Sequence, residues 1–409
     1  MSSSDADLGY ALTTNNQRFR GHGATIAANL IAATPPPPEL VAHHRAFGLG
    51  PTRIVCPAEP SVRATLAELV LADTDLVARL RADRSLRRIV VSFKSASAAR
   101  LIAALGLTPV YCDPAPEVYE LANDKLGLAR AGRRYGFDTL PTEVVSDDAT
   151  LAASFRSLSA RYGEGCILRL RRGASGRHIH HARTLRAARR LWRQLGARSS
   201  DVLLLPYVPA TVIGRNVATH GLVTADGFAP FLFTDQIVRR HAFRGGHTLD
   251  PWSPTEIAAI RTGLAGVGRW FRDLGYTGAP ASIDGFLLHE ADGPRFVLLD
   301  PNARMSGTMG PWAAITVLTE RAGQSLLWCF EGSRLYGIPL TFDRLCRRLG
   351  SDLLAPGAIE RGGVLPTFFA PRRRGPIGAT DLSAILVGRD ASHVEHLRRH
   401  VRSLGLIAR

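Results

Sequence analysis

The chain has 409 residues, more than a single hydrophobic core usually holds, so its length predicts two to three domains. Its apolar content of 45% and charged content of 21% are typical of a soluble globular protein, and no apolar run is long enough for a transmembrane helix. The net charge is +16, but the arginines are scattered, which favours a basic solvated surface over a nucleic-acid-binding patch.

The basic residues are almost all of one type. Of the 51 lysines and arginines only Lys94 and Lys125 are lysines, an imbalance that indicates a coding bias. A basic site for a phosphorylated or acidic small molecule is the functional alternative. The five cysteines are widely spaced without a C-x-x-C pair, and the N-terminus lacks the basic and apolar regions of a signal peptide. These patterns predict reduced thiols in a cytoplasmic protein.

Residues 1–119 predict a small parallel α/β domain, because strand and helix patterns alternate. Strands are expected at 53–56, 88–93 and 109–112, among helices at 24–33, 62–82 and 96–105. A polyproline break separates the first helix from the rest. No G-x-G-x-x-G follows a strand, so a dinucleotide site is not expected there.

The next segment places basic residues beside a small-residue loop. Asp124 or Asn123 is expected to cap a helix that begins with Lys125. Arg169 lies in a strand over 166–170, and a loop with glycine and serine follows, whose backbone N–H groups suit an anion. A further strand over 201–205 leaves through a stiff Pro-Tyr-Val-Pro segment.

Antiparallel strands and two helices are expected before and after residue 279. The strands are predicted at 217–223 and 231–234, and Gly245-Gly246 is interpreted as a flexible loop. A long amphipathic helix is predicted over 254–274, and another over about 312–329.

Residues 279–304 predict a β-hairpin with a turn at Ala-Asp-Gly. Asp284 is expected to open its first strand, Asp300 and Asn302 to close its second, and Arg304 to follow. Two carboxylates and an amide oxygen suit Mg²⁺, and the arginine suits a phosphate or carboxylate. The alternative is that Asp-Pro-Asn is ordinary turn chemistry.

The last eighty or so residues predict a small α/β segment. Strands are expected at 363–369 and 383–387, separated by a basic loop, and a helix at 391–404 ends the pattern.

In this order the features resemble the ATP-grasp superfamily over residues 120–335. The resemblance implies that Lys125 and Arg169 contact nucleotide phosphates and that a flexible loop closes over them. It also implies a hinge strand for adenine, three magnesium ligands, and an arginine from an Asn-x-Arg motif with a catalytic role. The residues implied are Lys125 and Arg169 for phosphate; Gly173, Ser175 and Gly176 for the loop; Leu205, Tyr207 and Val208 for the hinge; Asp284, Asp300 and Asn302 for magnesium; and Arg304.

Two positions depart from the family pattern. Arg169 replaces a lysine, which keeps the charge but changes a point charge into a planar fork. Leu205 stands where many members have glutamate, so the adenine or ribose contact there must come from backbone or from another residue.

The layout further resembles peptide ligases of the pheganomycin type. This implies an α/β fold with a pre-ATP-grasp parallel domain (1–119), a two-lobed ATP-grasp domain (120–335) and a C-terminal segment packing on the core (336–409). The implied reaction joins a small carboxylic acid to an amino acid or peptide amine through an acyl phosphate, with ATP and Mg²⁺ or Mn²⁺, in peptide or natural-product biosynthesis. A homodimer is the family-level expectation; no nucleic acid or membrane partner is expected. The alternatives are a small-molecule kinase on this fold and a nucleic-acid-binding protein using the basic charge.

Overall fold

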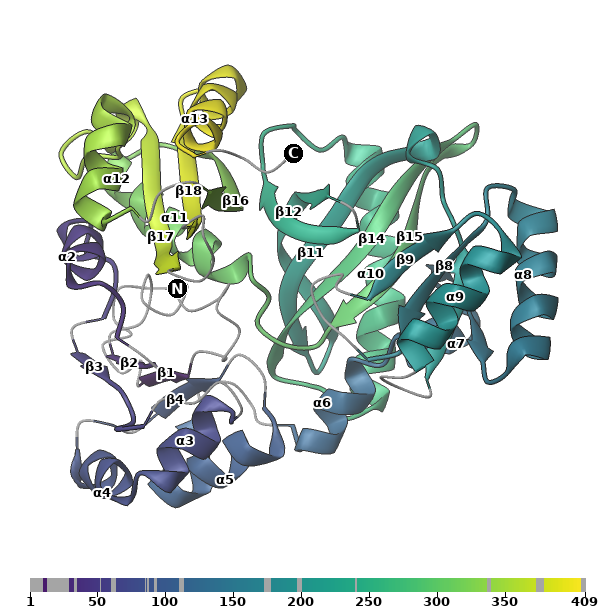
Figure 1. The fold of residues 1–409 in the computed structure, drawn as a ribbon, viewed down its shortest axis with the longest axis horizontal. Helices are drawn as coiled ribbons and strands as arrows, with labels where there is room; N and C mark the ends of the chain where they lie inside the picture. Colours follow the sequence, from purple (N-terminus) through teal and green to yellow (C-terminus); the bar gives the residue numbers. More distant parts are fainter. Residues whose placement is uncertain are drawn as a thin grey trace. The chain divides into compact units, whose positions relative to one another are not determined.

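The computed structural model describes most of the chain in two compact units (Figure 1). The first unit comprises residues 1–116, 245–250 and 304–409, and the second comprises 117–244 and 251–303. The domain boundaries predicted at residues 119 and 335 are not tested by this division and stay predictions. The described residues are 10–12, 29–32, 35–51, 53–59, 64–84, 86, 88–91, 94–109, 114–172, 178–196, 201–239, 241–336, 340–372 and 379–405.

The first unit contains a five-stranded sheet in the order β3-β2-β1-β4-β5, and every neighbouring pair is parallel. Its strands are β1 (Tyr10–Leu12), β2 (Asn29–Ile31), β3 (Arg53–Val55), β4 (Arg88–Val91) and β5 (Thr108–Pro109). The predicted parallel α/β domain is confirmed. The helix expected over 24–33 is wrong where the structure describes it, because β2 pairs with a strand on each side, and that pairing outweighs local helix propensity.

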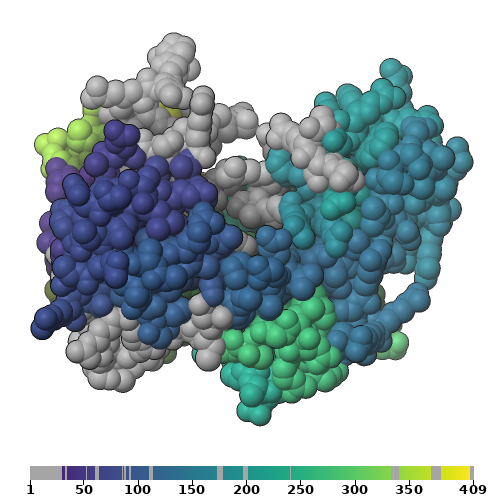
Figure 2. Space-filling model, turned by 90° about the horizontal axis from the view of Figure 1, so that it is seen from below, coloured from purple at the N-terminus to yellow at the C-terminus, as the bar shows by residue number. Residues whose placement is uncertain are grey.

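Helices pack their buried leucines against this sheet. They are α3 (Leu66–Ala72), α4 (Thr74–Ala82) and α5 (Ala96–Leu105). The unit also contains α2 (Pro38–Ala46). The single helix expected over 62–82 is divided at Asp73, whose side chain accepts a hydrogen bond from Leu76 N and caps α4. Figure 2 shows the surface that α3, α4 and α5 form, coloured indigo to blue.

The named strands in the remainder of the first unit pair in antiparallel fashion. Its elements are α11 (Met309–Ala322), β16 (Leu327–Tyr336), α12 (Phe342–Leu349), the 3₁₀ turns η3 (Gly350–Asp352) and η4 (Ile359–Arg361), β17 (Gly363–Arg372), β18 (Ala379–Gly388) and α13 (Ala391–Ser403). The strands pair in the order β17-β18-β16. The helix expected over 312–329 is wrong at its end, because Gly323 adopts a left-handed φ of 66° and stops α11 before β16.

Gly245-Gly246 is not a flexible loop. Both glycines lie in β13 (Ala242–His247) and pair with β16. A Cβ atom at Gly245 would lie 1.7 Å from the carbonyl oxygen of Phe330, so the glycine is needed for close approach of two backbones.

The second unit contains a four-stranded sheet in the order β7-β10-β8-β9, with two helices packed on it. The strands are β7 (Glu143–Val145), β8 (Cys166–Leu170), β9 (Ile179–Ala182) and β10 (Val202–Pro206); the helices are α8 (Asp148–Tyr162) and α9 (Leu185–Gly196). Apolar residues of both layers form one core.

A larger sheet of the second unit runs β12-β11-β14-β15-β6. These strands are β6 (Asp138–Thr139), β11 (Ile213–Thr224), β12 (Gly227–Arg239), β14 (Ala279–Glu290) and β15 (Gly293–Asn302). Helices α7 (Lys125–Tyr135) and α10 (Pro254–Asp273) pack against β15 and against each other; α6 (Pro116–Ala122) and η2 (Ala210–Val212) complete the unit. Of the helices described in either unit, none has the length and hydropathy needed to cross a membrane.

Candidate functional site

The acidic hairpin forms as predicted and brings its oxygen donors together. Asp284 on β14 lies directly opposite Asp300 on β15, and the amide nitrogen of Asn302 donates a hydrogen bond of 3.0 Å to Asp284 Oδ2. Asp284 does not open its strand, since β14 begins at Ala279 and pairs with β11 along most of its length. Because residues two apart share a face of a strand, Asp300 and Asn302 lie on the same side as Asp284.

A β-bulge follows this cluster. The register shifts between Asp284 and Gly285, leaving an extra residue on β15. A Cβ atom at Gly285 would lie 2.5 Å from the carbonyl oxygen of Val297, so only glycine lets the two backbones approach here. The bulge therefore fixes where Asp284 stands relative to Asp300.

The Asn-Asp-Lys segment at the start of α7 ties that helix to the hairpin. The Asn123 side chain donates to the carbonyl oxygen of Ala303 at 3.2 Å and accepts from its N–H at 3.1 Å, as a paired strand would. Lys125 Nζ lies 2.8 Å from Asp300 Oδ1, forming an ion pair in which the lysine side chain is 6% exposed and the aspartate 24%. That oxygen is buried and receives no hydrogen bond of good geometry.

Asp124 caps α7 by accepting a hydrogen bond from Leu126 N. Arg171 also donates hydrogen bonds to both carboxylate oxygens of Asp124, at 2.8 and 2.6 Å. Burial alone would raise the pKa of Asp124, but the hydrogen bonds and charge of Arg171 lower it overall. The start of α7 is thus held by a bidentate ion pair from the end of β8.

Arg169 is a second buried cation near Asp300. Its side chain is almost fully buried, and Nη1 donates to the carbonyl oxygen of Leu299 at 3.1 Å. Burial lowers the pKa of this guanidinium, and the charge of Asp300 acts in the opposite direction. Its Nε is buried without a hydrogen-bond partner among the described residues, so the site retains a donor that could serve an anion.

The structure describes only some of the other residues predicted to contact the nucleotide. Gly173, Ser175 and Gly176 lie outside the described residues. In the hinge, Leu205 is buried and paired with Ile167 in the β8–β10 ladder.

Just beyond the hinge strand, Tyr207 and Val208 are half-buried. Tyr207 N–H is already bonded to Gly165 O at 3.1 Å, and its ring stacks on His181 at 3.9 Å. The backbone N–H of Tyr207 is therefore already used within the protein, and the predicted adenine contact stays a prediction.

Arg304 follows Asn302 closely in the chain but belongs to the first unit, where it is half-buried. Its predicted role beside the acidic cluster stays a prediction.

Both lysines of the chain are buried. Lys125 is 5% exposed at the start of α7, and Lys94 is 7% exposed between β4 and α5. Surface positive charge in the described regions is therefore carried by arginine.

The donor chemistry fits a hard divalent cation. Asp284, Asp300 and Asn302 supply carboxylate and amide oxygens from neighbouring strands. Lys125 neutralises part of their negative charge through its ion pair with Asp300. The cations Lys125 and Arg169 approach the same carboxylate from α7 and β8. This arrangement can bind polyanionic phosphate together with a metal ion.

Two residues of the cluster were missed by sequence reasoning. Arg171 follows a strand as part of a basic pair, and nothing local distinguishes it from Arg172, which instead pairs with Glu120 at the surface. Ser282 is opposite Asn302, which only the strand register reveals.

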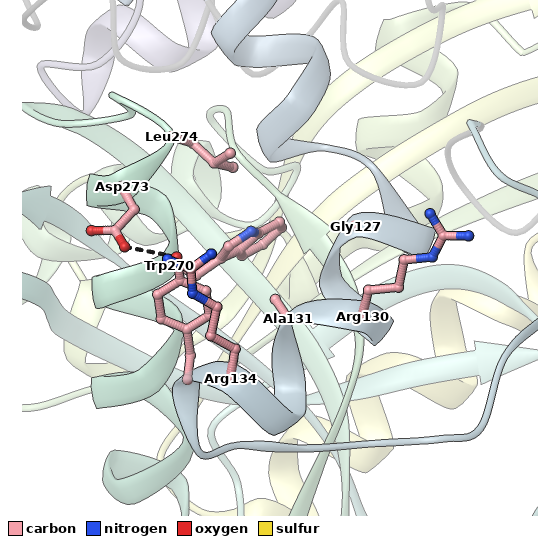
Figure 3. Close-up of a pocket in the computed structure, with 8 residues that line it drawn as sticks. Gly127, Arg130, Ala131, Arg134, Trp270, Asp273 and Leu274 are labelled. Carbon is pink, nitrogen blue, oxygen red and sulfur yellow. Dashed lines mark hydrogen bonds between the residues drawn. The ribbon is translucent and has the colours of Figure 1, made fainter.

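A surface hollow of about 590 Å³ lies between α7 and α10 (Figure 3). It is lined by Gly127, Arg130, Ala131, Arg134, Tyr135, Trp270, Asp273 and Leu274. The Tyr135 hydroxyl donates to Asp273 at 2.7 Å, the dashed line in Figure 3. No predicted site residue lines this hollow, so it is separate from the predicted phosphate and metal site.

Comparisons with known proteins show the fold. No protein-family model matches the chain, and no curated protein matches it. Among solved structures, N5-carboxyaminoimidazole ribonucleotide synthetase from Thermus thermophilus matches with a TM-score of 0.57 and 16% identity, covering 98% of this chain and 99% of that one.

Two further structures match at similar length. The biotin carboxylase domain dimer of Hydrogenobacter thermophilus 2-oxoglutarate carboxylase, in complex with MgADP, ADP and bicarbonate, has a TM-score of 0.57 and 14% identity over 98% of this chain and 90% of that one. Carboxyaminoimidazole ribonucleotide synthase from Aspergillus clavatus, complexed with ATP, has a TM-score of 0.56 and 10% identity over 97% and 99%. The chain therefore has the ATP-grasp fold, with an N-terminal parallel α/β domain, over nearly its whole length.

Proposed function

We propose that the protein is an ATP-dependent ligase that phosphorylates a carboxylate and joins the activated acyl group to an amine. The observation that carries this proposal is the convergence of Lys125 and Arg169 on Asp300 of the acidic hairpin, within an ATP-grasp fold. The acceptor is an amino acid or peptide, and the setting is the biosynthesis of small peptides or natural products.

The two buried cations are the phosphate-binding residues in this proposal. Lys125 presents an ammonium group and Arg169 presents an unsatisfied Nε–H, both from positions nearly closed to water. Such donors stabilise negative charge more strongly than exposed ones, because little solvent screens them. Gly173, Ser175 and Gly176 would add backbone N–H groups from the loop, and Leu205, Tyr207 and Val208 would border the adenine.

Asp284, Asp300 and Asn302 would hold Mg²⁺, which when bound supplies positive charge against the phosphate oxygens. In the structure, Lys125 pairs with Asp300 and the Asn302 amide donates to Asp284. Binding of the metal nucleotide would release Lys125 from Asp300 to the phosphates. The acidic hairpin and the lysine would thus exchange partners when the metal nucleotide binds.

The reaction proceeds in two substitutions. A carboxylate oxygen attacks the γ-phosphorus of ATP and ADP leaves, giving an acyl phosphate. The amine then attacks the acyl carbon, phosphate leaves, and the nitrogen loses a proton. Arg304 is proposed to hold the carboxylate or the acyl phosphate. No covalent enzyme intermediate is required.

A second candidate is carboxylation, with bicarbonate as the acid. The structures similar over the whole chain include a biotin carboxylase domain containing bicarbonate and MgADP. That same structure is a dimer, which supports the proposal of a homodimer here. Bicarbonate therefore belongs in any substrate screen of this protein.

The test is an ADP-release screen over pairs of carboxylic acids, including bicarbonate, with amino acids and short peptides, followed by mass spectrometry of the product. We expect ADP release to require both substrates and the product to be an amide. A phosphorylated product that accumulates without an amine would instead identify a kinase.

Three variants give the screen its controls. Lys125→Ala and Asp300→Ala are expected to abolish ADP release, while circular dichroism shows that both stay folded. Arg130→Ala changes an exposed arginine on the hollow side of the same helix and is expected to keep full activity. Unchanged turnover in either of the first two variants would overturn the proposed site.

A further inference from the structure

Ser282 carries a buried hydroxyl that nothing in the proposed site uses. The residue is 1% exposed, and its Oγ makes no hydrogen bond with any described residue. A buried hydroxyl without a partner costs on the order of 1–3 kcal/mol, so such groups are rare unless they serve another state of the protein.

The strand register places this hydroxyl beside the acidic cluster. Ser282 is directly opposite Asn302 on β15 and two residues before Asp284 on β14, so the three side chains share one face of the sheet. Opposite residues of antiparallel strands have Cβ atoms roughly 4.5–5.5 Å apart, within reach of a hydrogen bond between serine and asparagine side chains.

On the other side of Ser282 the sheet offers a neutral group. His220 of β11 is opposite Ser282 and is fully buried, with its Nε2 3.2 Å from Thr234 Oγ1. Burial lowers the pKa of His220 to about 3, so this neighbour is uncharged at neutral pH. On the two neighbouring strands, the residues opposite Ser282 are therefore a neutral histidine of β11 and Asn302 of β15.

The Asn302 amide has to change partner if the cluster binds a cation. The amide nitrogen faces Asp284 because an ionised carboxylate only accepts hydrogen bonds. If the oxygens of both residues held a cation, the amide hydrogens of Asn302 would need an acceptor other than Asp284. Ser282 Oγ is such an acceptor, on the adjacent strand.

We propose that Ser282 is a positioning residue for the cation site: its hydroxyl accepts the amide hydrogens of Asn302 when the Asn302 oxygen turns to a divalent cation. This inference rests on the proposed function, since it requires that Asp284, Asp300 and Asn302 bind magnesium. Groups that orient metal ligands in this way typically change metal affinity about 10- to 100-fold when they are removed.

The test is Ser282→Ala, measured by calorimetric titration of ADP at a series of MgCl₂ concentrations and in EDTA, together with the thermal midpoint of the ligand-free protein. We expect the magnesium concentration for half-maximal ADP binding to rise about 10- to 100-fold. ADP affinity in EDTA should be unchanged. The ligand-free Tm should be equal or higher, because the variant removes an unsatisfied buried group.

Thr219→Val is the matched control. Thr219 is a fully buried hydroxyl on β11, and its Oγ1 donates to the Ile283 carbonyl at 3.2 Å. Its loss is expected to lower the Tm and leave the magnesium dependence unchanged, the reverse of Ser282→Ala.

The outcomes distinguish a failure of the proposed function from a failure of the proposed role of Ser282. Wild-type protein that binds no ADP at any magnesium concentration would overturn the proposed function itself. Wild-type protein that binds ADP with magnesium, beside a Ser282→Ala variant of equal magnesium dependence, would overturn only the role of Ser282. A variant that loses Tm and ADP binding even in EDTA would show a structural role and also overturn the inference.

Discussion

Replacing Asp300 by asparagine should change nucleotide binding in opposite directions with and without magnesium. Asp300 holds Lys125 at 2.8 Å and also faces Arg169, so it competes with any phosphate for both cations. In EDTA the Asp300→Asn variant removes this competing charge, and we expect an ATP analogue to bind about tenfold tighter, equivalent to about 1.4 kcal/mol. With magnesium the variant lacks one of the proposed carboxylate ligands, and we expect binding to be at least about tenfold weaker.

The same substitution has a cost in stability. Lys125 and Arg169 remain buried without the Asp300 carboxylate, and breaking a buried ion pair costs about 3–5 kcal/mol. Asp300 keeps a quarter of its side chain in solvent, so we expect a value near the lower end, about 3 kcal/mol. At roughly 2–4 °C per kcal/mol, the Tm of the ligand-free variant should fall by about 6–12 °C.

The assay is titration of a non-hydrolysable ATP analogue, in EDTA and in excess MgCl₂, well below the Tm of the variant. Asp292→Asn, in the exposed turn of the same hairpin, is the matched control and should change neither affinity nor stability. The reasoning is refuted if Asp300→Asn shifts affinity in the same direction under both conditions, because Asp300 would then not exchange Lys125 for a cation.

Two further predictions concern the supports of the site. The folded-state pKa of Asp124 is lowered, so its stabilising effect is present above its unfolded value near 3.8 and is lost as pH falls through the lowered pKa. Arg171→Ala should therefore cost on the order of 1–3 kcal/mol at pH 7 in urea unfolding, with a deficit that shrinks below about pH 4; a deficit independent of pH would contradict this. Gly285→Ala would force a Cβ to within 2.5 Å of Val297 O, so we expect a lower Tm and weaker magnesium-dependent ADP binding. Gly196→Ala, where a Cβ meets nothing within 4 Å, is its control, and equal effects in both variants would refute the role of the bulge.

The hairpin was predictable because its signals are local. A turn sequence between two apolar runs fixes the pairing, and the pairing brings Asp284 opposite Asp300. The cap at Asp124 was equally readable, since the preference for aspartate at that position comes from the helix end itself.

The wrong predictions concern segments whose structure depends on pairing with strands distant in the sequence. The segment around β2 is apolar without a clear period, and only pairing with β1 and β3 makes it a strand. Gly245 suggested a loop, whereas its lack of a side chain serves the contact with β16. A glycine that allows close packing and a glycine that allows a turn have the same letter in a sequence.

The charged residues of the candidate site could be predicted from the sequence, but the contacts between them could not. The lysine and the acidic residues follow from motif order, but the grip of Arg171 on Asp124 joins residues far apart in the chain. The burial of Ser282 depends on two neighbouring strands and has no local signal.

The two buried lysines give the molecule an unusual chemical surface. Apart from the α-amino group, the chain has no primary amine outside Lys94 and Lys125, and both are closed to solvent. Reagents and enzymes that acylate or cross-link lysine therefore have no lysine target on the described surface. Labelling of Lys125 itself, located by peptide mapping, would therefore report the opening of α7 away from the hairpin, and a bound nucleotide phosphate is expected to protect the same amine.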